Sequence, residues 1–286
     1  MLKKKKLKNI FYIYFIINKF IYINNINMLK LSKTIEIKNS TLILIFSSNG
    51  NASNIASTLL IKNYPFENIG FYYSQYMSHS VCENGKGNLE FNGSLNFNEE
   101  KKILILDLSG GISKNNWYDF NEEFFKFLND NNFKEIYILS STDKENLIDK
   151  EIKSNEINVY YETNKKDFKC DSMKKIQEAF EVEENTKENK IYYELGLVEI
   201  SESEQKILQR MILDKIDFIF LFTFSDDIFD PFTGLALFNK ISFILGLNNK
   251  DEKVMKKQID ALNQLNEIEK NGLKIDSSWK ILLMGE

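Results

Sequence analysis

Residues 41–60 read TLILIFSSNGNASNIASTLL, and this stretch decides the fold class. Its first six residues form an almost unbroken apolar run, which is typical of a strand covered on both faces of a parallel or mixed sheet. A short polar turn around Gly50 follows. Beyond it, apolar residues recur at the i, i+3, i+4, i+7 spacing of an amphipathic helix: Ala52, Ile55, Ala56 and Leu59. A buried strand that leads through a tight turn into a helix predicts the first unit of an α/β domain.

The same alternation continues along the chain. Further apolar runs predict buried strands at residues 103–108 (ILILDL), 136–139 (IYIL) and 218–224 (FIFLFTF). Helical periods are expected at residues 120–128 after a cap at Asp119, and at 173–180, 207–212, 235–245 and 255–268. This pattern predicts a single α/β domain, with a mostly parallel or mixed sheet and helices on both faces. Residues 89–91 and 95–97, separated by Asn92-Gly93-Ser94, predict a small hairpin inserted into it.

Charge and cysteine usage narrow the function class. The net charge is -4, and because residues 1–27 are rich in lysine and contain no acid, the rest of the chain is more acidic still. An acidic body repels phosphate backbones, which argues against nucleic acid as a partner. Cys82 and Cys170 form neither a CxxC motif nor a dense disulfide pattern. Two free thiols suit a reducing compartment, so we expect a cytoplasmic and possibly nuclear protein.

The lysine-rich N-terminus resembles a signal peptide only in part. The apolar run at residues 10–17 is much shorter than the roughly 20 residues that a membrane-spanning helix needs. Asn24 and Asn25 stand where small residues would mark a cleavage site. We therefore expect residues 1–27 to be a disordered or dispensable extension, residues 28–286 to form the domain, and no membrane to be involved.

The turn at residues 47–51 lies where Rossmann-like proteins bind phosphate, between a buried strand and a helix. It has one glycine where the dinucleotide fingerprint needs three, and it lacks the Lys-Ser/Thr pair of a P-loop. We expect a structural turn in which Gly50 has positive φ and Asn51 or Ser53 caps the helix. The loop at residues 109–111 has the same interpretation. No cofactor is expected.

Catalytic and metal sites find little support in the sequence. His79 is the only histidine, and Cys82 lies three residues away, whereas a catalytic Cys and His normally come from separate elements. One histidine and two distant cysteines cannot supply the four ligands of a structural zinc site. We therefore expect no catalytic residue, no metal and no enzymatic activity.

An acidic stretch at Asp226, Asp227 and Asp230 follows the strand at residues 218–224, where a magnesium-binding loop could lie. The alternative interpretation is the start of a helix, with Asp230 as the N-cap and Pro231 in the first turn. The apolar period from Leu235 onward favours the helix start.

Four short motifs resemble one family, proteasome assembly chaperone 2. Residues 48–52 (SNGNA) and 68–73 (NIGFYY) resemble its glycine-asparagine turn and its "IGYFY" strand. Residues 136–141 (IYILSS) are similar to a strand that ends in serines, and residues 275–285 (IDSSWKILLMG) resemble the family's closing "IPSSWRLLFG". The motifs occur in the family's order from about residue 28 to residue 285.

The resemblance implies a non-catalytic chaperone on an α/β fold. It also implies a heterodimer with a proteasome assembly chaperone 1-like subunit, which binds proteasome α subunits and promotes α-ring assembly of the 20S core particle. Two groups of residues are candidates for partner binding, the turn and the C-terminal motif: Asn49, Gly50, Asn51, Trp279, Leu282 and Leu283.

Two points qualify this expectation. The family's pair can insert tails that end in hydrophobic-Tyr-any residue, but this chain has Gly285 in place of that tyrosine. Tail insertion is therefore not expected of this subunit. The alternative function is a small-molecule enzyme of nucleoside-phosphorylase type with a site near Gly50 and Asp107. It would need an arginine to hold phosphate, and the chain has only Arg210.

Overall fold

The computed structural model describes residues 29–32, 35–46, 48–77, 81–83, 89–91, 93–109, 112, 116–143, 159–164, 171–180, 202–225 and 230–247. The strands are β1 (Leu29–Leu31), β2 (Thr41–Ile45), β3 (Glu67–Tyr72), β4 (Val81–Glu83), β5 (Leu89–Phe91), β6 (Ser94–Asn98), β7 (Ile103–Asp107), β8 (Glu135–Asp143), β9 (Val159–Thr163) and β10 (Ile219–Ser225). The helices are η1 (Asn49–Asn51), α2 (Ala52–Asn63), α3 (Trp117–Asn131), α4 (Asp171–Phe180), α5 (Glu202–Leu213) and α6 (Pro231–Ile244).

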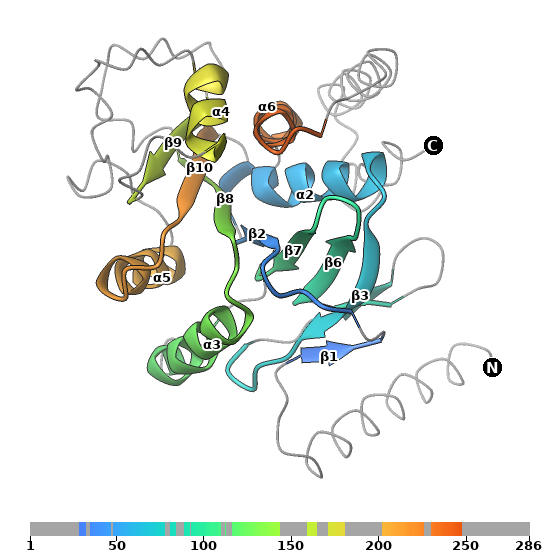
Figure 1. The fold of residues 1–286 in the computed structure, drawn as a ribbon, viewed down its shortest axis with the longest axis vertical. Helices are drawn as coiled ribbons and strands as arrows, with labels where there is room; N and C mark the ends of the chain where they lie inside the picture. Colours follow the sequence, from blue (N-terminus) through green and yellow to red (C-terminus); the bar gives the residue numbers. More distant parts are fainter. Residues whose placement is uncertain are drawn as a thin grey trace, which may run out of the picture.

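An eight-stranded mixed sheet organises the fold, in the order β1-β3-β6-β7-β2-β8-β10-β9 (Figure 1). Its centre, β7-β2-β8-β10, is parallel throughout. Antiparallel strands complete both edges, with β6, β3 and β1 on one side and β9 on the other. The four strands expected from apolar runs are the four parallel ones, which confirms the predicted mixed α/β sheet.

Helices cover both faces of the sheet, as the sequence predicts. Along β2, Leu42 and Leu44 pack in one core with α3 and α5, whereas Ile43 and Ile45 pack in a second core with α2, α4 and α6. All four side chains are fully buried. The alternation follows from the two-residue repeat of a strand, so one continuous apolar run serves two helix layers (Figure 1).

The predicted hairpin is wrong in its pairing. The chain does contain a small two-stranded sheet, but β5 pairs with β4, while β6 joins the main sheet between β3 and β7. Gly93 explains the difference. Its amide donates to the Asp107 carbonyl and its carbonyl accepts from the Tyr72 amide, both at 2.7 Å. At φ +86°, with a Cβ that would lie 2.3 Å from the Tyr72 oxygen, Gly93 leads into β6 instead of turning a hairpin.

Helix α3 begins earlier than the sequence indicates. Its first residue is Trp117, and Asn116 holds the N-cap position, so Asp119 lies inside the first turn. The prediction that Asp119 caps this helix is therefore wrong. Its carboxylate still has a favourable place, because the N-terminal turn carries the positive end of the helix dipole.

Candidate functional site

The C-terminal ends of β2, β8 and β10 lie beside the N-termini of α2 and α6, at the end of the sheet where the parallel strands finish. Beyond β2 the chain leads through α2 toward β3, whereas beyond β8 it leads to β9 and β10 on the opposite side. Such a switch point is where open α/β sheets bind ligands. Here the turn η1 lies in that position, against β8, β10 and α6.

Gly50 fills the centre of this turn. Its φ is 63°, as predicted, and a Cβ built on it would lie 2.3 Å from Ser225 Oγ and 3.0 Å from Asp230 Cβ. Its carbonyl oxygen accepts a hydrogen bond of 2.8 Å from the Asp230 amide. Both the left-handed backbone and the lack of space restrict this position to glycine.

Asp230 caps α6, which confirms the predicted helix start with Pro231 behind it. One carboxylate oxygen, Oδ1, accepts hydrogen bonds from the amides of Phe232 and Thr233, each at 3.1 Å. The other, Oδ2, accepts from Ser225 Oγ at 3.2 Å. The carboxylate is therefore engaged by its own helix and by β10. Asp226 and Asp227 lie outside the described residues.

The cap of α2 differs from the prediction. Asn51 holds the N-cap position with φ 55°, but its side chain accepts from Asn54 Nδ2 at 2.6 Å and does not cap the helix. Ser53 donates its hydroxyl to the Phe46 carbonyl at 2.6 Å. The capping acceptor is Ser48 Oγ, which receives the Ser53 amide at 3.3 Å. The expectation that Asn51 or Ser53 caps α2 is therefore wrong.

These contacts bear on phosphate binding at the turn. The amide of Asn51 donates to the Ser48 carbonyl at 3.1 Å, and the Ser53 amide is taken by Ser48 Oγ. Donors that would hold a phosphate are thus used within the turn itself. Gly50 is buried and Asn51 is half-buried, so the turn packs mainly against its own domain. The partner-binding role of Asn49, Gly50 and Asn51 stays a prediction.

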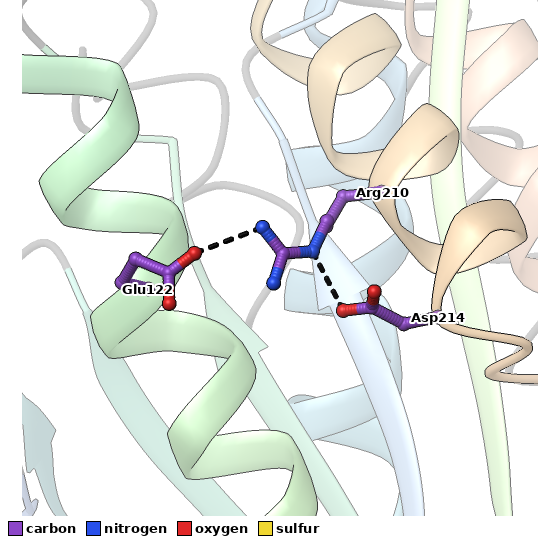
Figure 2. Close-up of polar contacts among 3 residues, drawn as sticks. All are labelled: Glu122, Arg210 and Asp214. Atoms are coloured by element: carbon purple, nitrogen blue, oxygen red, sulfur yellow. Dashed lines mark hydrogen bonds and ion pairs between the residues drawn. The ribbon is translucent and has the colours of Figure 1, made fainter.

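Arg210 lies in the opposite helix layer, where it connects α5 to α3 (Figure 2). Its Nη1 is 2.9 Å from Glu122 Oε1, its Nε is 2.6 Å from Asp214 Oδ2, and its guanidinium lies 5.4 Å from the centre of the Phe125 ring. The hydrogen bonds to Asp214 and Glu122 raise the pKa of Arg210. This arginine is engaged by two carboxylates, which disfavours its use as an anion clamp.

Asp107 was the other residue named for the phosphorylase alternative. Its Oδ1 accepts a hydrogen bond from the Ser109 amide at 2.8 Å.

The sequence did not predict a polar pair between β3 and α3, formed by buried Ser74 and half-buried Glu123. Ser74 Oγ donates to Glu123 Oε2 at 2.8 Å, and burial raises the pKa of Glu123, which this hydrogen bond partly offsets. Burial, with a smaller contribution from the charge of Glu123, raises the pKa of Tyr72. The signal was present, because Glu123 falls within the apolar stripe of Phe120 and Phe124.

The described residues do not include several of the candidate residues named from the sequence. His79, Cys170 and the C-terminal candidates Trp279, Leu282 and Leu283 lie outside the described residues. Cys82 is in β4, where only the backbone is described. Within the described ranges, no cluster of three or more His, Cys, Asp or Glu side chains could hold a metal ion. No helix in that part of the chain is long and apolar enough to cross a membrane.

One family model matches this chain, and several solved structures share its fold. The sequence model described as PAC2 family matches residues 42–268. Among solved structures, Pyrococcus furiosus PbaA, described as an archaeal homolog of proteasome-assembly chaperone, has a TM-score of 0.55 at 15% identity, covering 85% of this chain and 96% of its own. PbaB, from the same organism and described as an archaeal proteasome activator, has a TM-score of 0.59 at 15% identity, covering 84% and 98%. A search of curated proteins finds no match.

Proposed function

Because this chain belongs to the PAC2 family, we propose that it is a proteasome assembly chaperone that acts by binding other proteins. The observation that carries the proposal is the extent of the family match. Residues 42–268 run from the first parallel strand past the end of α6, so the chain shares a whole domain with the family and not one short motif. The similar folds of PbaA and PbaB support the same role.

In its finer form, the proposal gives the chain two kinds of partner. It pairs as a heterodimer with a proteasome assembly chaperone 1-like subunit, and the pair binds proteasome α subunits and promotes α-ring assembly of the 20S core particle. The proposed location is the cytoplasm and possibly the nucleus, which fits two cysteines without a disulfide pattern. The acidic body fits protein partners better than nucleic acid.

The proposal assigns no catalytic activity to the chain. Two contacts support this part of it. At the switch point, Gly50 packs against Ser225 and Asp230, in the place where an α/β enzyme would hold substrate. The only arginine, Arg210, is paired with Glu122 and Asp214 in the other helix layer. A nucleoside-phosphorylase type of activity therefore gains no support from the residues near Gly50.

Affinity purification followed by mass spectrometry tests the proposal. The full chain, tagged at its N-terminus, should recover a second chaperone subunit together with proteasome α subunits. An untagged lysate serves as the control. Size-exclusion chromatography of the purified complex should show the two chaperone subunits eluting together after the α subunits are removed by salt. Recovery of neither α subunits nor a second chaperone subunit would contradict the proposal.

A further inference from the structure

Helices α3 and α5 lie side by side and run in the same direction on one face of the sheet (Figure 1). Lys206 Nζ of α5 lies 5.3 Å from the centre of the Trp117 ring of α3. Further along both helices, the Arg210 guanidinium lies 5.4 Å from the centre of the Phe125 ring. Because both contacts advance from the N-terminal to the C-terminal ends, the two helices form one parallel layer.

This layer carries most of the exposed apolar side chains in the described part of the chain. Of the five large apolar residues that are exposed there, three lie on α3 or α5: Tyr118, Ile212 and Leu213. Tyr118 is 74% exposed and Leu213 is 77% exposed, the two highest values in that group. A single exposed apolar residue is ordinary, but two of them on neighbouring helices indicate an interaction site.

Both residues lie along the boundary between the two helices. We name this boundary the α3–α5 seam, and the residues that line it are Tyr118, Glu122, Lys206, Arg210 and Leu213. An ion pair of 2.9 Å joins Glu122 to Arg210 across it (Figure 2). Tyr118 lies one helical turn before Glu122, and Leu213 lies three residues after Arg210, so each is on the same side of its helix as the ion pair. Leu213 follows Lys206 by seven residues, so it is about 10 Å further along the seam.

The charged side chains along the seam already have counter-charges. Arg210 pairs with Glu122 and, at 2.6 Å, with Asp214. Lys206 Nζ is 2.8 Å from Glu202 Oε1. Both cations also lie over aromatic rings of α3, which attract them further. A partner that covers the seam therefore needs no opposite charges of its own, and this surface fits an apolar partner face with few charges.

The size of the layer limits the kind of partner. α3 has 15 residues and α5 has 12 residues. Together they present a face about 20 Å long and about 20 Å wide, or roughly 400 Å². That is about half of the roughly 800 Å² that each partner buries in a stable complex. Such an area suits a transient partner and is too small for a permanent dimer, either with a second copy or with another chaperone subunit.

We propose that the α3–α5 seam is a docking surface for a transient protein partner that presents an apolar face. Tyr118 is the anchor of this surface, because tyrosine is among the residue types that contribute most to binding at interfaces. Leu213 adds a second apolar contact at the other end. The choice of partner rests on the proposed function, which supplies proteasome α subunits as the transient partners of the chaperone.

Binding measurements with purified proteins test this surface. The full chain, purified together with its second chaperone subunit, is titrated with purified α subunits. Tyr118→Lys and Leu213→Lys should each weaken the affinity at least about tenfold, because docking would bury a lysine without a counter-charge. Phe243→Lys is the matched control, since Phe243 is 54% exposed on α6, in the opposite helix layer. It should leave the affinity unchanged.

The outcomes separate this surface from the proposed function. If the unmodified pair binds no α subunit, the proposed function is wrong and the docking surface is wrong with it. If the unmodified pair binds and both seam variants bind equally well, only the docking surface is wrong. Thermal unfolding should show similar melting temperatures for all variants, because each substitution is at an exposed site.

Cysteine labelling gives a second result that needs no lysine substitution. The full chain carries Cys82→Ser, Cys170→Ser and Leu213→Cys, and mass spectrometry of the labelled peptide follows its reaction with a maleimide. Saturation with α subunits should slow this reaction at least about tenfold, because docking removes the thiol from solvent. Equal rates with and without α subunits would overturn the proposal. Slow labelling in the chaperone pair alone would also overturn it, by placing the seam in the interface of the pair.

Discussion

The carbonyl oxygen of Gly50 accepts a hydrogen bond of 2.8 Å from the amide of Asp230, so the turn after β2 is tied directly to the start of α6. There is also no room for a side chain at Gly50, because Asp230 Cβ lies 3.0 Å from where a Cβ of Gly50 would be. The two helices α2 and α6 therefore start from one shared point at the edge of the sheet. Changes at this point should affect the stability of the whole domain.

Gly50→Ala should lower the free energy of unfolding by more than about 2 kcal/mol. Two effects add, since the residue has φ 63° and the new Cβ would lie 2.3 Å from Ser225 Oγ. Gly246→Ala is the matched control, because Gly246 has φ +64° and its nearest contact is the flexible Lys175 Nζ at 3.3 Å. It should cost only about 1 kcal/mol. Urea denaturation of both variants measures the difference, and equal losses would show that crowding at Gly50 is unimportant.

The sequence predicted the centre of this fold better than its edges. Helices cover both faces of β2 and β10, so Ile43 and Phe222 belong to nearly continuous apolar runs. The edge strands β1 and β9 have no such run, and the composition of Leu29–Leu31 alone does not distinguish a strand from a loop.

Parts of the candidate site depend on contacts between distant residues. Gly50 was correctly predicted to have positive φ, because a strand-to-helix turn with one glycine needs it there. The sequence did not predict that Ser48 caps α2. The hydroxyl of Ser53 donates to the Phe46 carbonyl, and the amide of Ser53 donates to Ser48 Oγ. The contact of Gly50 with Ser225 depends on how β10 is placed in the sheet, and local spacing carries no information about that.

Glu123→Gln should change how stability depends on pH. Burial raises the pKa of Glu123 in the folded state, so the folded protein holds this proton more tightly than the unfolded chain. The stability that this raised pKa contributes is therefore present below about pH 4.5 and is lost as pH rises through the folded-state pKa. Glutamine keeps an acceptor for Ser74 Oγ and does not ionise, so this variant should lack that loss.

The measurement for Glu123 is urea denaturation at a series of pH values from about 4 to 8. The wild-type chain, measured over the same pH series, is the reference. If Glu123→Gln follows the wild-type curve throughout, the carboxyl of Glu123 is not destabilised by burial.

Arg210→Ala should cost about 1 kcal/mol of stability, because it removes two ion pairs at a partly exposed site and the contact with the Phe125 ring. Thermal unfolding in low and high salt separates the ionic part, which salt screens. Calorimetric titration with inorganic phosphate should show no binding for the wild type. Phosphate binding that Arg210→Ala abolishes would revive the phosphorylase alternative.

Deleting residues 1–27 should change the free energy of unfolding by less than about 0.5 kcal/mol, the usual scale for surface changes. Deleting residues 1–31 is the matched comparison, because it also removes β1, which pairs with β3 from Leu29↔Tyr72 to Leu31↔Gly70. The longer deletion exposes the edge of β3 and should be clearly destabilising. If the chain without residues 1–27 fails to fold, the domain begins before residue 28.

The proposed binding to α subunits should not need residues 284–286. Residues 284–286 are Met-Gly-Glu, and none of them offers an aromatic ring to fill a pocket on the α ring. Removing residues 284–286 should therefore leave recovery of α subunits in a pulldown nearly unchanged. Trp279→Ala is the informative comparison, because an anchoring tryptophan costs at least about 2 kcal/mol when truncated, in a core or in an interface. Lower thermal stability would place Trp279 in the core, whereas lost α-subunit recovery at unchanged stability would place it in the interface. Loss of binding on removal of residues 284–286 alone would show that the tail inserts without a tyrosine.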